Sequence, residues 1–324
     1  MKNVGSDETA RADILDAAAY GGAGWLPRHA SLRQEIGGLW AACGVEREWT
    51  RLRAVLLHTP GAEWDDLADA DAAQMLTLPD AAAARRQHQA LADAYAAAGV
   101  AVSQIAPATT PSPNLLFAAD LFFMTPEGAI VGRPASTVRA GEERWVARRL
   151  ADLGVPILRT VRGAGVFEGA DAMWLDTRTV LLGRGLRTNA AGAAQVAAML
   201  RELGVAVVET ELPVGAMHLM GQLRLVDGDL ALAWPYRLGH GALVALRQRG
   251  YEVLFVPDEV EAARRGALNV VTLGPREVMM PASCPHTQRF YEENGITCHT
   301  VEVGELLKAA GGIACMTGIL WRDE

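Results

Sequence analysis

Five segments of this 324-residue chain share one plan: a helix-like pattern, then a glycine, then a short apolar run typical of a strand. The glycines are Gly99, Gly154, Gly204, Gly250 and Gly295, at successive spacings of 55, 50, 46 and 45 residues. Glycine just past a helix is the usual left-handed C-terminal cap, so each one predicts a corner from helix to strand. A repeat of this period constrains the fold more than any other feature of the chain.

A second pattern recurs in phase with the glycines. Pairs of apolar runs joined by short turns predict β-hairpins, and they lie at residues 121–132, 172–183, 223–234 and 270–280. Each hairpin precedes the helix of its own unit. The repeating unit is therefore hairpin, helix and strand, with a length of about 50 residues.

The fifth hairpin is split between the two ends of the repeating region. The run at 52–61 opens this region and the run at 311–321 closes it, so pairing the two would close a ring without exposed sheet edges. We expect a five-bladed α/β propeller with one pseudo-axis over residues 51–324, and an extension at residues 1–50 packed on the ring. A doubly wound open sheet has the same strand–helix alternation, but the hairpins favour the ring.

Charge and hydropathy exclude several classes of partner. Lys plus Arg number 30 against 38 Asp plus Glu, a net charge of −8, whereas a nucleic-acid binder needs a basic surface. No apolar run reaches the roughly 18 residues of a membrane helix, so no membrane partner is expected. The polar and acidic first residues do not resemble a secretory signal, and a cytoplasmic location is expected.

The four cysteines, Cys43, Cys284, Cys298 and Cys315, are irregularly spaced and predict neither a disulfide framework nor a zinc ribbon. We expect free thiols, as in a reducing compartment. Cys284 and His286 offer two ligands of the kind that bind transition metals, but two are too few, so no metal is expected.

Chemically reactive residues occupy equivalent places in the predicted repeats. Asp120, His218 and Cys315 stand just before the first strand of three hairpins, and the pair Glu168 and Asp171 does so in a fourth. Equivalent positions in a ring converge on its axis. We therefore expect these side chains to share one central cleft.

This combination of residues suits the chemistry of guanidines. A thiolate is a strong nucleophile, and a nearby histidine can transfer protons. Carboxylates near a thiol oppose its ionisation, but they suit a guanidinium substrate, whose planar N–H donors match paired carboxylates and whose charge stabilises a thiolate. The expected reaction is attack on the guanidinium carbon, departure of an amine with His218 as acid, and hydrolysis of an amidino-cysteine.

Each of these residues also has an ordinary structural interpretation. A lone cysteine such as Cys315 is often an apolar filler, and the other three thiols are alternatives to it as nucleophile. His218 lies in an apolar segment, where a hydrogen-bonded core histidine is common. Glu168 and Asp171 could cap a turn, and Arg187 could form a surface ion pair.

Six segments together resemble the guanidino-group-modifying superfamily, which includes arginine deiminase, dimethylarginine dimethylaminohydrolase and the amidinotransferases. They are RLRAVLLHTPGAE (51–63), PNLLFAAD (113–120), VFEGAD (166–171), GLRTN (185–189), MHL (217–219) and GGIACMTG (311–318). The resemblance extends over residues 51–324 and implies the superfamily's five-bladed α/β propeller, in agreement with the repeat count. The ordered set is more specific than any one motif.

The resemblance implies a role for each matching residue and requires neither a cofactor nor a metal. Cys315 is the implied nucleophile, and Glu168 is the implied partner of the catalytic His218. The implied substrate contacts are Asp120 with the guanidinium, Asn114 with the amino-acid end, Arg187 with the carboxylate, and Asp171 as the second acid of its pair.

Two positions depart from the superfamily pattern. Ala170 replaces the second glycine of Glu-Gly-Gly-Asp and is still small. Met220 stands where arginine deiminases and amidinotransferases carry the aspartate of His-x-Asp, a second guanidinium ligand. Dimethylarginine dimethylaminohydrolase also lacks this aspartate. We therefore expect Met220 to contact the substrate and to favour an N-substituted guanidine, because a thioether accepts hydrogen bonds poorly.

The prediction from the sequence is a cysteine-dependent hydrolase acting on the guanidinium group of arginine or an N-substituted arginine-like compound. The alternative is an amidinotransferase, which would use the same covalent intermediate with an amine acceptor. A guanidine-binding protein without activity is disfavoured because the thiol, the histidine and the acids are all present. The expected partner is a small guanidino compound, and the sequence leaves open both its identity and whether the chain forms a homo-oligomer.

Overall fold

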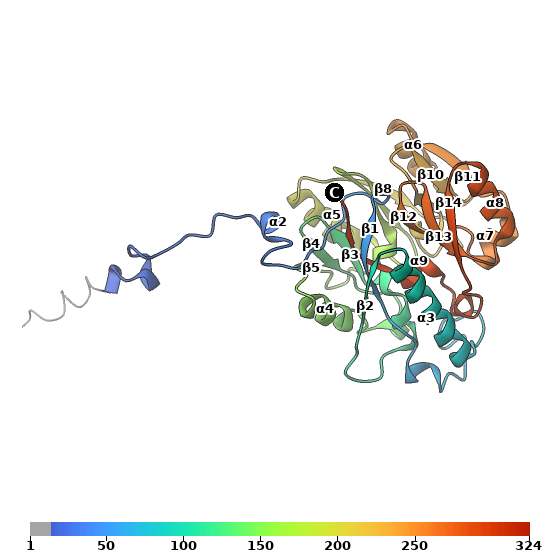
Figure 1. The fold of residues 1–324 in the computed structure, drawn as a ribbon, viewed down its shortest axis with the longest axis horizontal. Coiled ribbons are helices and arrows are strands. Elements are labelled where there is room, and N and C mark those ends of the chain that lie inside the picture. The colour runs from blue at the N-terminus through green and yellow to red at the C-terminus, as the bar shows by residue number, and fades with distance from the viewer. Residues whose placement is uncertain (1–13) are drawn as a thin grey trace, which may run out of the picture. The chain divides into compact units, whose positions relative to one another are not determined.

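The computed structural model describes residues 14–324 (Figure 1). Its contacts divide the chain into two compact units, one ending at Glu35 and one comprising Ile36–Glu324. The first unit contains a short 3-10 helix η1 (Ala18–Tyr20) and α2 (Leu32–Glu35). The second unit contains all fifteen strands of the described chain.

The strands form five sheets of three strands each. In every sheet the middle strand pairs antiparallel with one neighbour, its hairpin partner, and parallel with the other. The sheets are β15 (Gly318–Arg322), β1 (Leu52–Leu57) and β2 (Ala101–Gln104); β3 (Phe122–Thr125), β4 (Gly128–Val131) and β5 (Ile157–Thr160); β6 (Ala172–Asp176), β7 (Thr179–Arg184) and β8 (Ala206–Glu211); β9 (Leu223–Leu225), β10 (Leu230–Ala233) and β11 (Glu252–Phe255); β12 (Val271–Gly274), β13 (Glu277–Pro281) and β14 (Thr297–Val301).

The two ends of the repeating region form one blade, as the sequence predicts. Leu52 pairs with Arg322 and Leu56 with Gly318 across β1 and β15. Five separate three-stranded sheets exclude the doubly wound open sheet, because such a fold would have one continuous sheet. The five-bladed α/β propeller is confirmed.

One helix precedes the third strand of each blade, and Figure 1 shows several of these helices at the outside of the larger unit. They are α3 (Ala81–Ala97), α4 (Glu143–Asp152), α5 (Ala190–Glu202), α6 (His240–Gln248) and α8 (Pro285–Glu293), while the shorter α7 (Glu259–Arg265) precedes β12. The five predicted glycine corners all adopt a left-handed φ, between 74° and 84°. Asp80 begins α3 by accepting a hydrogen bond of 2.7 Å from the Ala83 amide.

The core lies between the strands and these helices. On α4, Val146 and Leu150 are fully buried and belong to one cluster with Ile130 and Val131 of β4. The strands of the predicted hairpins are buried on both faces, so they are apolar at successive positions and not only at alternate ones. In the described part of the chain no helix is both long and apolar enough to cross a membrane.

Residues 36–50 belong to the larger unit. The backbone of Gly44 donates a hydrogen bond to Leu320 and accepts one from Arg322, at 2.9 and 3.0 Å. Cys43 and Val45 are buried in the same cluster as β3 and β4. The expected packing of the preceding residues on the ring stays a prediction.

Candidate active site

Four short helical turns carry the reactive residues, and each one directly precedes the first strand of a blade. Successive turns contact one another around the axis. This arrangement brings side chains from distant parts of the sequence together. The positions are Asp120 at the end of η4 (Ala118–Asp120), Glu168 as N-cap of η6 (Gly169–Asp171), His218 as N-cap of η7 (Leu219–Gly221), and Cys315 in α9 (Ile313–Met316).

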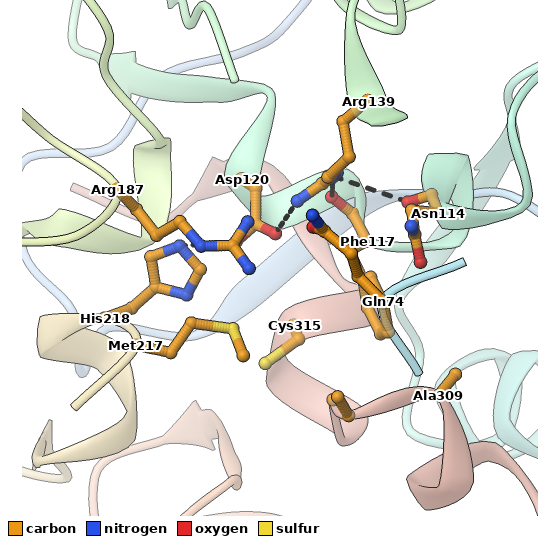
Figure 2. Close-up of a pocket in the computed structure, with 12 residues that line it drawn as sticks. Gln74, Asn114, Phe117, Asp120, Arg139, Arg187, Met217, His218, Ala309 and Cys315 are labelled. Carbon is orange, nitrogen blue, oxygen red and sulfur yellow. Dashed lines mark hydrogen bonds and ion pairs between the residues drawn. The ribbon is translucent and has the colours of Figure 1, made fainter. Parts of the chain in front are cut away.

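A hollow of about 340 Å³ lies between these turns. Figure 2 shows Asp120, His218 and Cys315 around it, with Asn114 and Arg187 also in its wall. An adjoining cleft of about 1120 Å³, open to solvent, shares His218 and Cys315 with the hollow and is lined by Met220. The structure therefore separates Met220 from the wall that holds Asp120.

His218 and Glu168 form a buried pair. His218 Nε2 lies 2.7 Å from Glu168 Oε2. Burial alone would lower the pKa of His218, but the charges of Asp120 and Glu168 outweigh it and raise this pKa to about 10. Burial in turn raises the pKa of Glu168, but the bond from His218 and its charge outweigh that effect and bring it to about 2. At neutral pH the pair is an imidazolium held by a carboxylate.

A buried arginine, Arg139, holds one edge of Asp120. Its Nη1 lies 2.5 Å from Asp120 Oδ2, and its Nη2 lies 2.8 Å from Glu142 Oε2. Burial works against its charge, but Glu142, Asp120 and Glu168 outweigh burial and raise the pKa of Arg139 above its ordinary value. Three acids around one buried cation keep this part of the site rigid and charged.

The other edge of Asp120 faces His218 and makes no hydrogen bond among the described residues. Its Oδ1 is buried, has no hydrogen-bond partner among the described residues, and lies 3.8 Å from His218 Nε2. An unpaired buried acceptor is costly, so a ligand donor is expected there. The guanidinium of a substrate supplies such donors beside the imidazolium and the thiol.

Asn269 holds Cys315 in place. Its Nδ2 donates to Cys315 Sγ at 3.0 Å, and its Oδ1 accepts from the Ala314 and Cys315 amides at 2.8 and 3.3 Å. A side chain at Gly312 would place its Cβ 2.7 Å from the Asn269 amide group, which explains a glycine in the GGIACMTG segment. The structure thus gives the thiol a fixed position and one hydrogen-bond donor.

The other three thiols lack such an environment. Burial raises the pKa of Cys43 to about 11, and it raises the pKa values of Cys284 and Cys298 to about 12. Thiols with such values are almost fully protonated at neutral pH and are poor nucleophiles. This comparison favours Cys315, which is half-buried at the hollow.

A second buried cation, Arg224 of β9, interacts electrostatically with Cys315 from the interior of the ring. Burial lowers the pKa of Arg224 to about 10, against the opposing effects of Cys315 and Glu48. Arg224 lines an inner cavity together with Ala314, which precedes the nucleophile.

Asp171, an expected substrate contact, lies behind the site. Its Oδ1 accepts a hydrogen bond from the Leu219 amide at 2.9 Å, and its Oδ2 accepts one from Thr188 Oγ1 at 2.6 Å. Asp171 is fully buried and lines neither the hollow nor the cleft. The carboxylate positions the turn that follows His218, and a contact of Asp171 with substrate stays a prediction.

Arg187 and Asn114 line the hollow as expected of substrate-binding residues. Arg187 Nη1 lies 3.4 Å from Glu168 Oε1, so its guanidinium is close to the catalytic pair. Asn114 Nδ2 donates to the Ala73 carbonyl at 2.8 Å, and its buried Oδ1 has no partner among the described residues. This oxygen can accept a bond from an ammonium group.

The described residues contain two groups of donors close enough to hold a metal ion. Asp120, Glu168 and His218 form one, but the guanidinium of Arg139 lies against both acids and its charge opposes a second cation. The other group is Asp258, Glu261 and His286. There Asp258 caps α7, and the Glu261 carboxylate accepts bonds from the first residues of α8, so both acids have structural roles.

Sequence reasoning missed Arg139, Asn269 and Gln74. Asn269 stands two residues before β12, so the repeat phase could have identified it as the fifth equivalent position. Arg139 lies after β4, outside the phase of the repeat, and only its burial reveals it. Gln74 and Ala310 line the hollow with left-handed φ angles of 56° and 71°, a conformation that is strained without glycine and is frequent at functional sites.

Known enzymes are similar to this chain. The N(G),N(G)-dimethylarginine dimethylaminohydrolase of Streptomyces coelicolor is 30% identical over 236 residues, which cover 72% of this chain and 84% of that enzyme. The enzyme of the same name from Pseudomonas aeruginosa is 26% identical over 264 residues, or 81% of this chain and 97% of that enzyme. A crystal structure of a dimethylarginine dimethylaminohydrolase adduct with 4-chloro-2-hydroxymethylpyridine has a TM-score of 0.68 at 25% identity, covering 84% of this chain and 100% of that one.

The likeness in fold extends to amidinotransferases. An amidinotransferase of the saxitoxin pathway from Microseira wollei has a TM-score of 0.70 at 15% identity, covering 88% of this chain and 98% of that one. The sequence profile described as arginine deiminase matches residues 72–242 and 236–322, well over half of the chain. The chain therefore belongs to the arginine deiminase family, within the guanidino-modifying superfamily that its motifs resemble.

Proposed function

We propose that this protein hydrolyses a C–N bond in the guanidinium group of an N-methylated arginine through an amidino-cysteine on Cys315. The observation that carries the proposal is the hollow itself. It combines a thiol, an imidazolium and the unpartnered Oδ1 of Asp120 within one small space. Two relatives that this chain matches over most of their length are named dimethylarginine dimethylaminohydrolases, which supports a methylated substrate.

The first half of the reaction forms the covalent intermediate. The substrate guanidinium donates hydrogen bonds to Asp120 Oδ1, and its positive charge favours the thiolate of Cys315. The sulfur attacks the guanidinium carbon and forms an S–C bond. The C–N bond to the methylated nitrogen then breaks, and His218 gives its proton to the departing amine.

The second half releases the product. His218, now neutral, accepts a proton from water as the water oxygen attacks the amidino carbon. The C–S bond breaks and its electron pair returns to the sulfur. The new hydroxyl group loses its proton to solvent, and a urea-type product leaves. Glu168 holds the ring in one orientation throughout and stabilises its protonated form, as the 2.7 Å bond indicates.

A product assay tests this proposal. Wild-type protein is incubated with arginine and with mono- and dimethylated arginines, and citrulline, ammonia and the methylated amines are measured. Mass spectrometry of acid-quenched protein should locate an amidino adduct on Cys315. Cys315→Ser should remove turnover and the adduct while the far-UV spectrum is unchanged, because a serine hydroxyl stays protonated near neutral pH.

Cys298→Ser is the matched control, because this half-buried thiol lies outside the hollow. It should retain full turnover. An adduct on Cys284 or Cys298, or turnover that survives in Cys315→Ser, would overturn the assignment of the nucleophile.

Amidino transfer is the alternative outcome of the same intermediate. The superfamily fold accommodates both reactions, and the open cleft beside Cys315 leaves space for an amine acceptor. The assay is therefore repeated with added amines. A new guanidine that forms faster than citrulline would replace hydrolysis by transfer as the function.

A further inference from the structure

A larger cleft adjoins the reaction hollow and shares part of its wall. Counted out into open solvent, its volume is about 1120 Å³, against about 340 Å³ for the hollow. Met217, His218 and Cys315 line both spaces, so the nucleophile lies where the two meet. A guanidine held by Asp120 in the hollow would thus have its second substituent in the cleft.

The cleft has a cationic wall. Two arginines, Arg237 and Arg264, line it, and the described residues of its wall include no aspartate or glutamate. By contrast, the hollow has Asp120 beside its arginines. A cleft wall whose charges are all positive favours a ligand with a negative charge.

Arg237 is held in position before any ligand arrives. Its guanidinium stacks on the Trp234 ring at 4.7 Å, and its Nη1 donates to the Gly215 carbonyl at 3.0 Å. Glu259 Oε2 accepts a bond from the Trp234 indole at 2.6 Å, and no salt bridge joins Glu259 to Arg237. A stacked arginine with unused donors is well suited to bind a carboxylate.

Two further groups lack protein partners. Arg264, in the last turn of α7, is exposed and makes no hydrogen bond or ion pair with any described residue. Gln222 is 4% exposed and lines the cleft, yet its Oε1 has no partner among the described residues. This oxygen can only accept a hydrogen bond, so it suits the N–H of a departing amine and not its anionic group.

We propose that this cleft binds the amine that departs from the guanidinium carbon, and that in the preferred substrate this amine carries an anionic group such as a carboxylate. The proposal rests on the proposed reaction at Cys315, and it extends the substrates from N-methylated arginines to arginines whose guanidinium substituent is anionic. Dimethylamine carries no anionic group and is small compared with the cleft, so it leaves Arg237 and Arg264 without a ligand.

The chemical step is the same for such a substrate. Cys315 Sγ forms a bond to the guanidinium carbon, and the C–N bond to the substituted nitrogen breaks with its electron pair on nitrogen. His218 supplies the proton, and the amine leaves into the cleft with its anionic group toward the arginines. Water then completes hydrolysis, so no further reactant is needed.

A matched pair of substrates tests the proposal. N-carboxymethyl-arginine, substituted on the guanidinium, releases glycine, whereas the carbamoylmethyl analogue releases glycinamide and has almost the same size. We expect kcat/KM for the carboxylate to exceed that for the amide by at least about ten-fold, the range of one hydrogen bond to a charged group. Arg264→Gln should reduce this ratio toward one, and Arg237→Gln should act in the same direction.

Arg265→Gln is the control, because Arg265 lies next to Arg264 on α7 but does not line the cleft. It should keep the wild-type ratio. Dimethylarginine, whose leaving amine has no anionic group, should be turned over equally by wild type and Arg265→Gln.

The outcomes separate the two proposals. If wild type turns over guanidines but treats the carboxylate and the amide alike, the anionic subsite is wrong and the hydrolase stands. If the ratio is high but survives in Arg264→Gln and Arg237→Gln, the cleft is not the site of recognition. If no guanidine is turned over and no adduct forms on Cys315, the proposed function fails and this inference with it.

Discussion

Asp120 combines a structural contact with the substrate contact that we propose. Its Oδ2 is held by Arg139 at 2.5 Å, while its Oδ1 is buried without a partner among the described residues. Arg139 therefore fixes the direction of the free oxygen before a ligand binds. Such preorganisation lowers the entropy that binding would otherwise cost.

Asn269 provides a test of how the nucleophile is positioned. Asn269→Ala removes the donor to Cys315 Sγ and the acceptor for the Ala314 amide. A hydrogen bond to a charged group contributes about 1.5–3 kcal/mol, so alkylation of Cys315 by iodoacetamide at pH 7 should slow roughly ten-fold or more. Peptide mass spectrometry against time measures this rate, and kcat should fall with it.

Asn294→Ala is the matched control, since Asn294 caps α8 and donates to the Phe290 carbonyl far from the thiol. Both variants should have similar thermal unfolding. Unchanged alkylation in Asn269→Ala would mean that the amide does not position the sulfur.

The charge of His218 predicts how stability depends on pH. Its pKa is raised to about 10 in the folded protein, against about 6.5 in an unfolded chain. The folded state therefore binds this proton more tightly. The stability that it contributes is fully present below about pH 6.5 and is lost as pH rises through about 10.

Urea unfolding of wild type and His218→Gln between pH 6 and 10.5 measures this contribution. The difference in unfolding free energy between the two should shrink as pH rises, because only wild type loses a bound proton. The kcat of the variant should fall by roughly two orders of magnitude or more. A pH-independent difference in stability would show that His218 is neutral in the folded protein.

Met220 tests the preference for substituted guanidines. Met220 is half-buried and lines the cleft beside Cys315 and His218, where a substituent on the guanidinium would lie. An N–H donor buried against a thioether has no acceptor, which costs about 1–3 kcal/mol for each donor, whereas a methyl group packs well against it. Met220→Asp should shift the ratio of kcat/KM values toward unsubstituted arginine, and Met220→Leu should not. A wild-type preference for free arginine would contradict this interpretation.

At the scale of elements, the repeat predicted where each corner of a blade lies. The five glycine ends of helices have φ between 74° and 84°, and the hairpins form as the apolar runs indicate. Gly204 has open space around it, so a side chain there is disfavoured by the backbone conformation alone. Gly221 also has open space but no left-handed φ.

Gly204→Ala should therefore destabilise the protein by roughly 1–2 kcal/mol, the cost of a left-handed alanine. In a unit of this size that lowers Tm by about 2–4 °C per kcal/mol. Gly221→Ala should leave Tm unchanged within a degree or so. Gly204→Asn should lower Tm less than Gly204→Ala does, because asparagine tolerates a left-handed conformation. Differential scanning calorimetry distinguishes these outcomes, and equal Tm values for Gly204→Ala and wild type would contradict the cap.

The repeat also explains which site residues could be predicted. Asp120, Glu168, His218 and Cys315 share one phase before the first strand of a blade, so periodicity alone brings them to the axis. The position of a residue within the repeat does not determine which side-chain atoms come into contact. Asp171 has an equivalent position in its repeat, yet its carboxylate oxygens accept hydrogen bonds from the Leu219 amide and the Thr188 hydroxyl. Partners of this kind depend on side-chain direction, which the sequence pattern does not encode.

At the scale of the molecule, both ends of the ring meet in one blade. Arg53 of β1 donates two bonds of 2.7 Å to Asp323, which follows β15. The Asp323 amide donates to the Arg51 carbonyl at 2.9 Å. The pairing covers the edge of β1, so the first blade cannot be complete before the last residues are made.

The segment before the ring should divide into a dispensable part and an essential part. Contacts separate the unit ending at Glu35 from Ile36–Glu324, so a chain beginning at residue 36 should keep the wild-type Tm and kcat. A chain beginning at residue 51 loses the buried Cys43 and Val45, at about 1.5–3 kcal/mol for a side chain of that kind, and the backbone bonds of Gly44 to Leu320 and Arg322. It also loses Glu48, whose Oε1 accepts a bond from the Trp174 amide at 3.0 Å. We expect a Tm lower by several degrees or insoluble protein. Equal thermal unfolding of the two truncated chains would show that residues 36–50 are not part of the folded ring.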